Sequence, residues 1–152
     1  MALANLLAIQ RLLAFNATPH GVQRMLDAAA RNLADARIKQ LSADNRFDAA
    51  YKCILQCAML GLAAQGYRTS TSQPGHHQTA LQALPLSMGL PSDIIFVLDA
   101  LRRQRNLNDY EGDSISDGAV SECLAQAASL LAHTRQFLQI QFPALLAKPA
   151  KT

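Results

Sequence analysis

The side chains best suited to chemistry lie together on residues 92–109, a segment whose apolar spacing predicts an amphipathic helix that begins at Ser92. Ile94, Leu98 and Leu101 repeat at intervals of four and three residues, so they predict a buried stripe. The same helix then becomes cationic and rich in amides. The residues that change its character are Arg102, Arg103, Arg105, Asn106, Asn108 and Asp109. A polar group on a face meant for burial is costly, so these side chains are expected to have partners.

Charge pairs within the helix are the simplest interpretation of this cluster. Asp99 and Arg103 are four residues apart, as are Arg105 and Asp109, and helix ends near the surface often carry such pairs. The net charge of +3 is compatible with nucleic-acid contact. Three clustered arginines are nevertheless too few to predict binding to duplex DNA, and the sequence has no recognised DNA-reading motif.

Residues 101–112, Leu-Arg-Arg-Gln-Arg-Asn-Leu-Asn-Asp-Tyr-Glu-Gly, resemble the signature helix of HEPN domains. In that helix an arginine, usually followed by a polar residue such as asparagine, precedes a histidine by four to six positions. Arg105 and Asn106 match this pattern, and Tyr110 stands where the ribonuclease members have the histidine. Residues 42–77 are also similar to the first half of HEPN chains, with an Ala-rich helix, a Gly-containing loop and a His-bearing start to the next helix.

The resemblance implies a helical dimer that binds nucleotides or cleaves RNA without metal, with the arginine segments of two protomers facing each other. Arg105 would hold the phosphate, because a guanidinium binds phosphate in a fixed fork. Tyr110 is a poor substitute for the histidine in proton transfer, since its unperturbed pKa is about 10. It could instead donate a hydrogen bond to phosphate or stack on a base. On a continuous helix Arg105 and Tyr110 are roughly 140° apart, so they converge only if the helix unwinds near Asp109 to Gly112.

The expected site therefore has a centre and a surrounding set. The central, catalytic residues are Arg105, Asn106 and Tyr110. The surrounding binding residues are Arg102, Arg103, Asp109, His76 and His77. Because histidine titrates near neutral pH, His76 or His77 could supply the proton transfer that Tyr110 cannot, although two exposed loop histidines are more often idle.

Neither a metal nor a cofactor is expected. Cys53 and Cys57 lie one helical turn apart, but the four-ligand set of a structural zinc site is missing. With Cys123 the cysteines are odd in number, which excludes a complete disulfide framework and indicates a reducing compartment. We therefore expect core or half-buried thiols. A di-iron bundle is excluded by inventory, because no Glu-x-x-His motif occurs and the glutamates number only two.

The composition predicts one all-α domain over residues 1–152. Hydrophobic residues make up 50% of the chain and charged residues 16%, Ala and Leu are abundant, and Trp is absent. The low charged fraction also predicts that a partner covers apolar surface, as in a homodimer. Met1–Phe15 lacks a basic start, and Gln10 and Arg11 interrupt it well short of the ~20 apolar residues of a membrane span. A cytoplasmic protein without a membrane segment is expected.

Helix-start signals divide the chain into elements. Thr18 with Pro19, Ser42, and the capping-box pattern from Ser114 to Asp117 each predict a helix start. The long helices are expected at 18–41, 42–65, 92–109 and 116–142, with an N-terminal helix within 1–15, a short helix at 76–84 and a frayed tail at 147–152. Together they predict an up-and-down four-helix bundle of the HEPN type with an additional N-terminal helix and one short helix.

Two classes of function follow from these observations. The first is a HEPN-like protein that binds RNA or nucleotides, for example a toxin–antitoxin component with an antitoxin partner and a metal-independent endoribonuclease ancestry. The alternative is a non-catalytic helical interaction module, such as the partner or substrate-binding subunit of a nucleotidyltransferase. In the second class Arg105 is a structural or interface ion.

Overall fold

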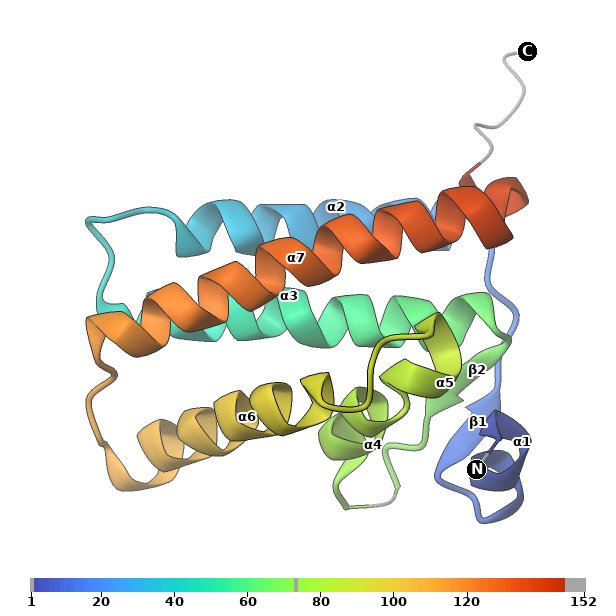
Figure 1. Ribbon diagram of the computed structural model, residues 1–152, viewed down its shortest axis with the longest axis horizontal. Coiled ribbons are helices and arrows are strands. Elements are labelled where there is room, and N and C mark those ends of the chain that lie inside the picture. The colour runs from blue at the N-terminus through green and yellow to red at the C-terminus, as the bar shows by residue number, and fades with distance from the viewer. Residues whose placement is uncertain (1, 73, 147–152) are drawn as a thin grey trace.

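Four long helices form the body of the molecule (Figure 1). The computed structural model describes residues 2–72 and 74–146, so the tail expected at 147–152 lies outside the described residues. The long helices are α2 (Pro19–Ala36), α3 (Ala43–Ala64), α6 (Ile94–Glu111) and α7 (Asp117–Gln141). They alternate in direction along the chain, as Figure 1 shows. The expected all-α class is confirmed.

Helix α3 is the centre of the structure. It packs against α2, α6 and α7, and against two short helices described below. One face of α3 forms a buried stripe, in which every member is at most 1% exposed: Phe47, Ala50, Tyr51, Ile54, Ala58 and Leu62. Small residues on α3 allow close approach of its neighbours, and at Gly61 a Cβ atom would lie 2.7 Å from Cγ of Met88.

Two of the expected helix starts are confirmed by side-chain caps. The hydroxyl of Thr18 accepts a hydrogen bond of 3.1 Å from the backbone N–H of Gly21. The hydroxyl of Ser42 likewise accepts from Asn45, also at 3.1 Å. These bonds satisfy backbone donors that have no partner inside the helix, which is why hydroxyl side chains favour this position.

The other two expected starts agree less closely. Helix α7 begins where the range 116–142 placed it, but its cap is Ser116, which accepts from the N–H of Ala119 at 3.1 Å, and not Ser114 of the capping-box pattern. Helix α6 begins at Ile94, and Ser92 does not cap it. The backbone before α6 already turns, since the N–H of Ile94 bonds to the carbonyl of Pro91 at 3.2 Å. The residue at the cap position is Asp93, which has helical dihedral angles and makes no side-chain cap bond.

The N-terminal segment is only partly helical. Helix α1 covers Leu3–Ala8, and strand β1 (Leu12–Ala14) then pairs antiparallel with β2 (Tyr67–Thr69). The helix expected within residues 1–15 is therefore confirmed only for Leu3–Ala8, and Leu12–Ala14 is a strand instead. Gln10 takes a positive φ of 64°, which breaks the helix. Burial of Leu12 at 0% exposure holds the strand in place, because a short apolar run fits either a helix or a strand until tertiary contacts decide.

Two short helices replace the single one expected at 76–84. They are α4 (His76–Gln82) and α5 (Leu84–Met88). The expected helix stopped at residue 84, but the next residue, Pro85, lies in the first turn of α5, where its missing N–H needs no partner. A 3₁₀ turn, Pro143–Leu146, follows α7.

Helix α3 is long and apolar enough to cross a membrane by length and composition alone. Its most apolar window is 67% buried inside the protein. Burial of this kind is what the central helix of a bundle requires, so the apolar composition of α3 is accounted for by its contacts with neighbouring helices.

Candidate functional site

Arg105 and Tyr110 lie on different faces of α6. The helix continues without interruption to Glu111 and ends at Gly112, which takes a left-handed φ of 70°. The unwinding that would bring the two side chains together does not occur. The side chain of Arg105 is 26% exposed and faces α3, whereas Tyr110 is 86% exposed. The structure therefore separates the expected catalytic arginine from the tyrosine in the histidine position.

The guanidinium of Arg105 is held by groups from two helices. Its Nε donates a hydrogen bond of 3.1 Å to Oδ1 of Asp48 on α3. Its Nη2 lies 3.7 Å from Oδ2 of Asp109, which confirms the expected pair within α6. Its Cζ lies 5.3 Å from the ring centroid of Tyr51, in cation–π contact. Two carboxylates thus neutralise Arg105, and Asp48 is itself shared with Lys52 at 3.4 Å.

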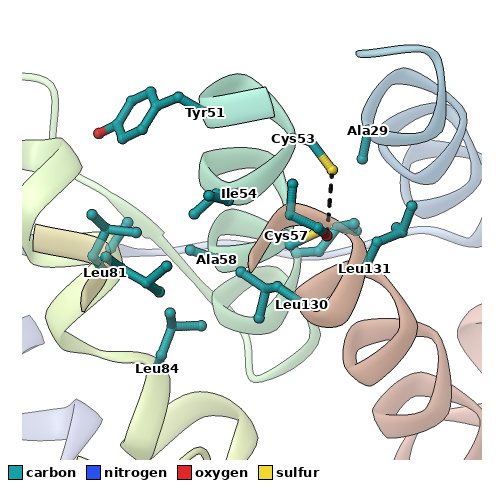
Figure 2. Close-up of a cluster of buried hydrophobic side chains, with 14 of the residues drawn as sticks. Ala29, Tyr51, Cys53, Ile54, Cys57, Ala58, Leu81, Leu84, Leu130 and Leu131 are labelled. Carbon is teal, nitrogen blue, oxygen red and sulfur yellow. Dashed lines mark hydrogen bonds between the residues drawn. The ribbon is translucent and has the colours of Figure 1, made fainter. Parts of the chain in front are cut away.

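Tyr51 places a hydroxyl group inside the protein. The residue is 1% exposed, and its hydroxyl has no hydrogen-bond partner among the residues that the structure describes. Burial raises the pKa of Tyr51 to about 12, although the positive charges of Arg105 and Arg102 oppose this shift. Tyr51 is therefore a neutral hydrogen-bond donor at neutral pH. Figure 2 shows it extending from α3 on the side opposite Ala29 of α2.

The histidine pair lies beside Tyr51 and not beside Tyr110. The ring centroid of His77 is 6.3 Å from that of Tyr51 and 4.5 Å from that of His76, which meets it edge-on. Burial lowers the pKa of His77, and the charges of His76, Arg105 and Arg102 lower it further. A neutral imidazole at this position can accept a proton. Because His77 and Arg105 both contact Tyr51, they lie at the same buried ring.

Arg102 and Arg103 share one carboxylate. The Nε of Arg102 donates to Oδ1 of Asp99 at 2.9 Å, and Nη2 of Arg103 donates to Oδ2 at 2.7 Å. The expected pair of Asp99 and Arg103 is thus confirmed. Partial burial would raise the pKa of Asp99, but the hydrogen bonds from Arg103 and Arg102 outweigh it and lower the pKa overall.

Three of the expected site residues meet on the outer side of α6. Arg103, Asn106 and Tyr110 line a surface hollow of about 340 Å³, together with Leu107 and Glu111. Their positions three and four apart place them on one helical face. This α6 outer hollow combines a guanidinium, a carboxamide and an exposed phenol ring, which can contact a phosphate, a base edge and a base face respectively.

The cysteines are core thiols, as expected. Cys53, Cys57 and Cys123 are all buried. The thiol of Cys53 donates to the carbonyl of Ala127 at 3.9 Å, shown as the dashed line in Figure 2. Burial raises the pKa of Cys123 to about 12, which keeps this thiol protonated and unreactive. Among the described residues, no three His, Cys, Asp or Glu side chains are grouped so that they could hold a metal ion.

Two residues that determine where Arg105 points, Asp48 and Tyr51, were not identified as site residues from the sequence. Asp48 is 57 positions away from Arg105, and no local pattern links them. Tyr51 was visible as a member of the buried stripe of α3, and its hydroxyl within that apolar stripe was the available signal of a polar site.

No protein-family model matches this chain, and comparison with curated proteins and with solved structures gives no match.

Proposed function

We propose that this protein binds single-stranded RNA or a nucleotide through the α6 outer hollow and does not cleave it. The observation that carries the proposal is that Arg103, Asn106 and Tyr110 line the same hollow. An exposed tyrosine ring offers a stacking surface for a base, and an arginine beside it offers a partner for the adjacent phosphate. A HEPN-like origin of this helix is part of the proposal.

The exposure of Tyr110 supports binding by stacking. A phenol ring that is 86% exposed leaves a large apolar surface in water, and a stacked base would cover it. Arg103 keeps most of its side chain accessible at 68% exposure despite its pair with Asp99. It can therefore reach a phosphate without leaving that carboxylate, because a guanidinium carries five N–H donors.

The separation of Arg105 from Tyr110 supports binding without cleavage. Metal-independent cleavage needs a charged group on the phosphate and a proton acceptor near the 2′-hydroxyl. Arg105 is paired with Asp48 and Asp109, and Tyr110 lies on another face of the helix. The candidate base His77 is half-buried against Tyr51, whose ring Arg105 also contacts.

A binding assay with a fluorescently labelled single-stranded RNA tests the proposal. We expect Tyr110→Ala to weaken binding about tenfold, the loss of one stacked base, and Tyr110→Phe to weaken it less. Arg103→Ala should weaken binding and reduce its salt dependence by about one phosphate contact. Phe96→Ala is the matched control, because Phe96 is 77% exposed on the same helix but lies outside the hollow. Equal affinity of Tyr110→Ala and the unmodified protein would refute the proposal.

Incubation of the RNA in EDTA tests the absence of cleavage. We expect no cleavage by the unmodified protein or by Tyr110→His, because position 110 does not face Arg105. Robust cleavage by the unmodified protein, abolished in a His76/His77 double alanine variant, would instead assign catalysis to the histidine pair beside Tyr51.

A second candidate is an interaction module that uses the same face of α6 to form a homodimer. The observation that favours it is an exposed stripe whose members are spaced by four and three residues: Phe96, Ala100, Arg103, Leu107 and Tyr110. This spacing matches the seam of a coiled coil. In an antiparallel pair Phe96 would lie opposite Tyr110 of the second copy, with Arg103 at the centre and Asp99 balancing its charge.

Sedimentation at micromolar concentration separates this candidate from RNA binding. A dimer through the stripe is expected to dissociate in both Phe96→Ala and Leu107→Ala, whereas RNA binding by a monomer depends on Tyr110 and not on Phe96. A monomer in both low and high salt excludes the dimer and leaves the RNA proposal intact.

A further inference from the structure

A hollow of about 500 Å³ lies between the N-terminal segment and α4, away from the outer face of α6. In Figure 1, α1 and β1 lie at the same end of the molecule as α4 and α5. Its aliphatic lining comes from Leu6, Ile9 and Leu86, and two of these side chains are unusually accessible, Ile9 at 56% and Leu86 at 40% exposure. Its volume is within the range of sites that bind small ligands.

The backbone around Gln10 presents one wall of this hollow. Gln10 has a φ of 64°, a left-handed conformation that residues with a side chain adopt at a cost. The chain reverses there, and the N–H of Arg11 bonds to the carbonyl of Leu6 at 3.0 Å. Ile9 and Arg11, the neighbours of Gln10, are both directed to the hollow. The next residue, Leu12, is fully buried, so the wall is anchored to the core.

Polar groups converge on the hollow from both sides. Gln78 and Gln82 lie one helical turn apart on α4, and each carboxamide carries both a donor and an acceptor. On the other wall, Arg11 provides a guanidinium that takes part in none of the ion pairs found among the described residues. The hollow thus offers three kinds of contact: an aliphatic surface, paired amides and one cation.

We propose that this hollow binds the end of a peptide chain, with an apolar C-terminal residue and a free carboxylate. The carboxylate matches the forked donors of Arg11, the peptide amide matches the carboxamides of Gln78 and Gln82, and the apolar side chain fits the aliphatic wall. The aliphatic lining favours an aliphatic side chain over a nucleobase, because the residues that line the hollow include no aromatic side chain on which a base could stack. The site is separate from the α6 outer hollow and does not depend on the RNA-binding proposal.

Titration of the folded protein with acetyl-glycyl-leucine, followed by amide chemical shifts, tests this assignment. The same peptide ending in a carboxamide is the paired ligand, since it lacks only the negative charge. We expect the acid to bind about tenfold more tightly than the amide, because the amide lacks one charge-assisted hydrogen bond. In Arg11→Ala the acid should bind about as weakly as the amide, and the two peptides should no longer differ. Gln82→Ala should weaken both peptides to the same extent.

Two control variants locate the effect. Arg31→Ala removes an exposed arginine of α2, and Tyr110→Ala alters only the outer face of α6, so both should bind the acid peptide as the unmodified protein does. Equal affinity for the acid and the amide, an unchanged difference in Arg11→Ala, or no saturable shift at residues of the hollow would each overturn the proposal. Tighter binding of adenosine monophosphate than of the peptide, lost in Arg11→Ala, would overturn the peptide assignment and identify a nucleotide site.

Discussion

The guanidinium of Arg105 contacts three groups at once: Asp48, Asp109 and the ring of Tyr51. The two ion pairs are partly exposed and therefore modest, and the contacts with Asp48 and Tyr51 connect α6 to α3. We predict that Arg105→Ala lowers the free energy of unfolding by about 1–2 kcal/mol and leaves RNA affinity per folded molecule unchanged. Urea denaturation and the RNA-binding assay measure the two effects separately.

Arg105→Lys is the control for this prediction. Lysine keeps the charge but lacks the planar fork, so it should recover the ion pair with Asp48 and only part of the contact with Tyr51. A large loss of RNA affinity in Arg105→Ala without a loss of stability would show that Arg105 binds the ligand and is not a structural ion.

Tyr51 makes the stability of the protein depend on alkaline pH. The folded-state pKa of about 12 lies above the ordinary value of 10.0. The stability that comes from keeping Tyr51 neutral is therefore complete below pH 10 and is lost as the pH rises toward 12. We expect the phenolate absorbance of the native protein to include a late component near pH 12 that Tyr51→Phe removes.

Tyr51→Phe also tests the unpartnered hydroxyl at neutral pH. Removing a buried polar group that has no partner is neutral or stabilising, by up to about 1 kcal/mol. A clear destabilisation, measured by urea denaturation, would mean that the hydroxyl has a hydrogen-bond partner such as a bound water. Because Cys123 also has a raised pKa of about 12, absorbance of phenolate is a better readout of Tyr51 than alkaline stability alone.

The contact of α5 with α3 depends on Gly61, which has no side chain. A Cβ atom at position 61 would lie 2.7 Å from Cγ of Met88 and 3.1 Å from Oγ of Ser87. We predict that Gly61→Ala lowers the free energy of unfolding by about 1–3 kcal/mol through overpacking, partly offset by about 1 kcal/mol of helix propensity. Thermal or urea denaturation of the variant provides the measurement.

A double-mutant cycle identifies the source of this cost. Met88→Ala removes the side chain that the new methyl group would meet, so Gly61→Ala should cost less in the Met88→Ala background than in the unmodified protein. Equal costs in the two backgrounds would place the strain elsewhere, for example at Ser87.

The elements predicted correctly from sequence are those specified by local interactions. Thr18 and Ser42 cap their helices through residues three positions away, and the period of α3 identifies its buried face. The missed elements depend on distant partners. Strand β1 forms only because Tyr67–Thr69 lies beside it, more than fifty residues later in the chain. The direction of Arg105 depends in the same way on Asp48, so the sequence identified the helix that carries Arg105 but not the face on which its side chain lies.

At the scale of the whole molecule, stability is distributed unequally between the helices. Twelve residues of α3 are buried, and α3 contacts neighbours on several sides. Helix α6 is also long, but only Leu98 and Leu101 are buried on it, and an exposed stripe runs along its outer face. Elements with few buried contacts open at lower free energy than the core, so α6 should separate from the bundle more readily than α3 does.

Native-state hydrogen exchange tests this difference. We predict that the amides of α3 exchange only through global unfolding, whereas those of α6 exchange through a local opening of lower free energy. Arg105→Ala should accelerate exchange in α6 and leave α3 nearly unchanged, because it removes contacts that join the two helices. Addition of RNA, or dimer formation at higher protein concentration, should slow exchange in α6. RNA or a second copy of the protein would bind α6 only while α6 is packed against the bundle, and this binding stabilises the packed state by mass action. Equal protection of α3 and α6 would contradict this prediction and would mean that the outer helix unfolds together with the core.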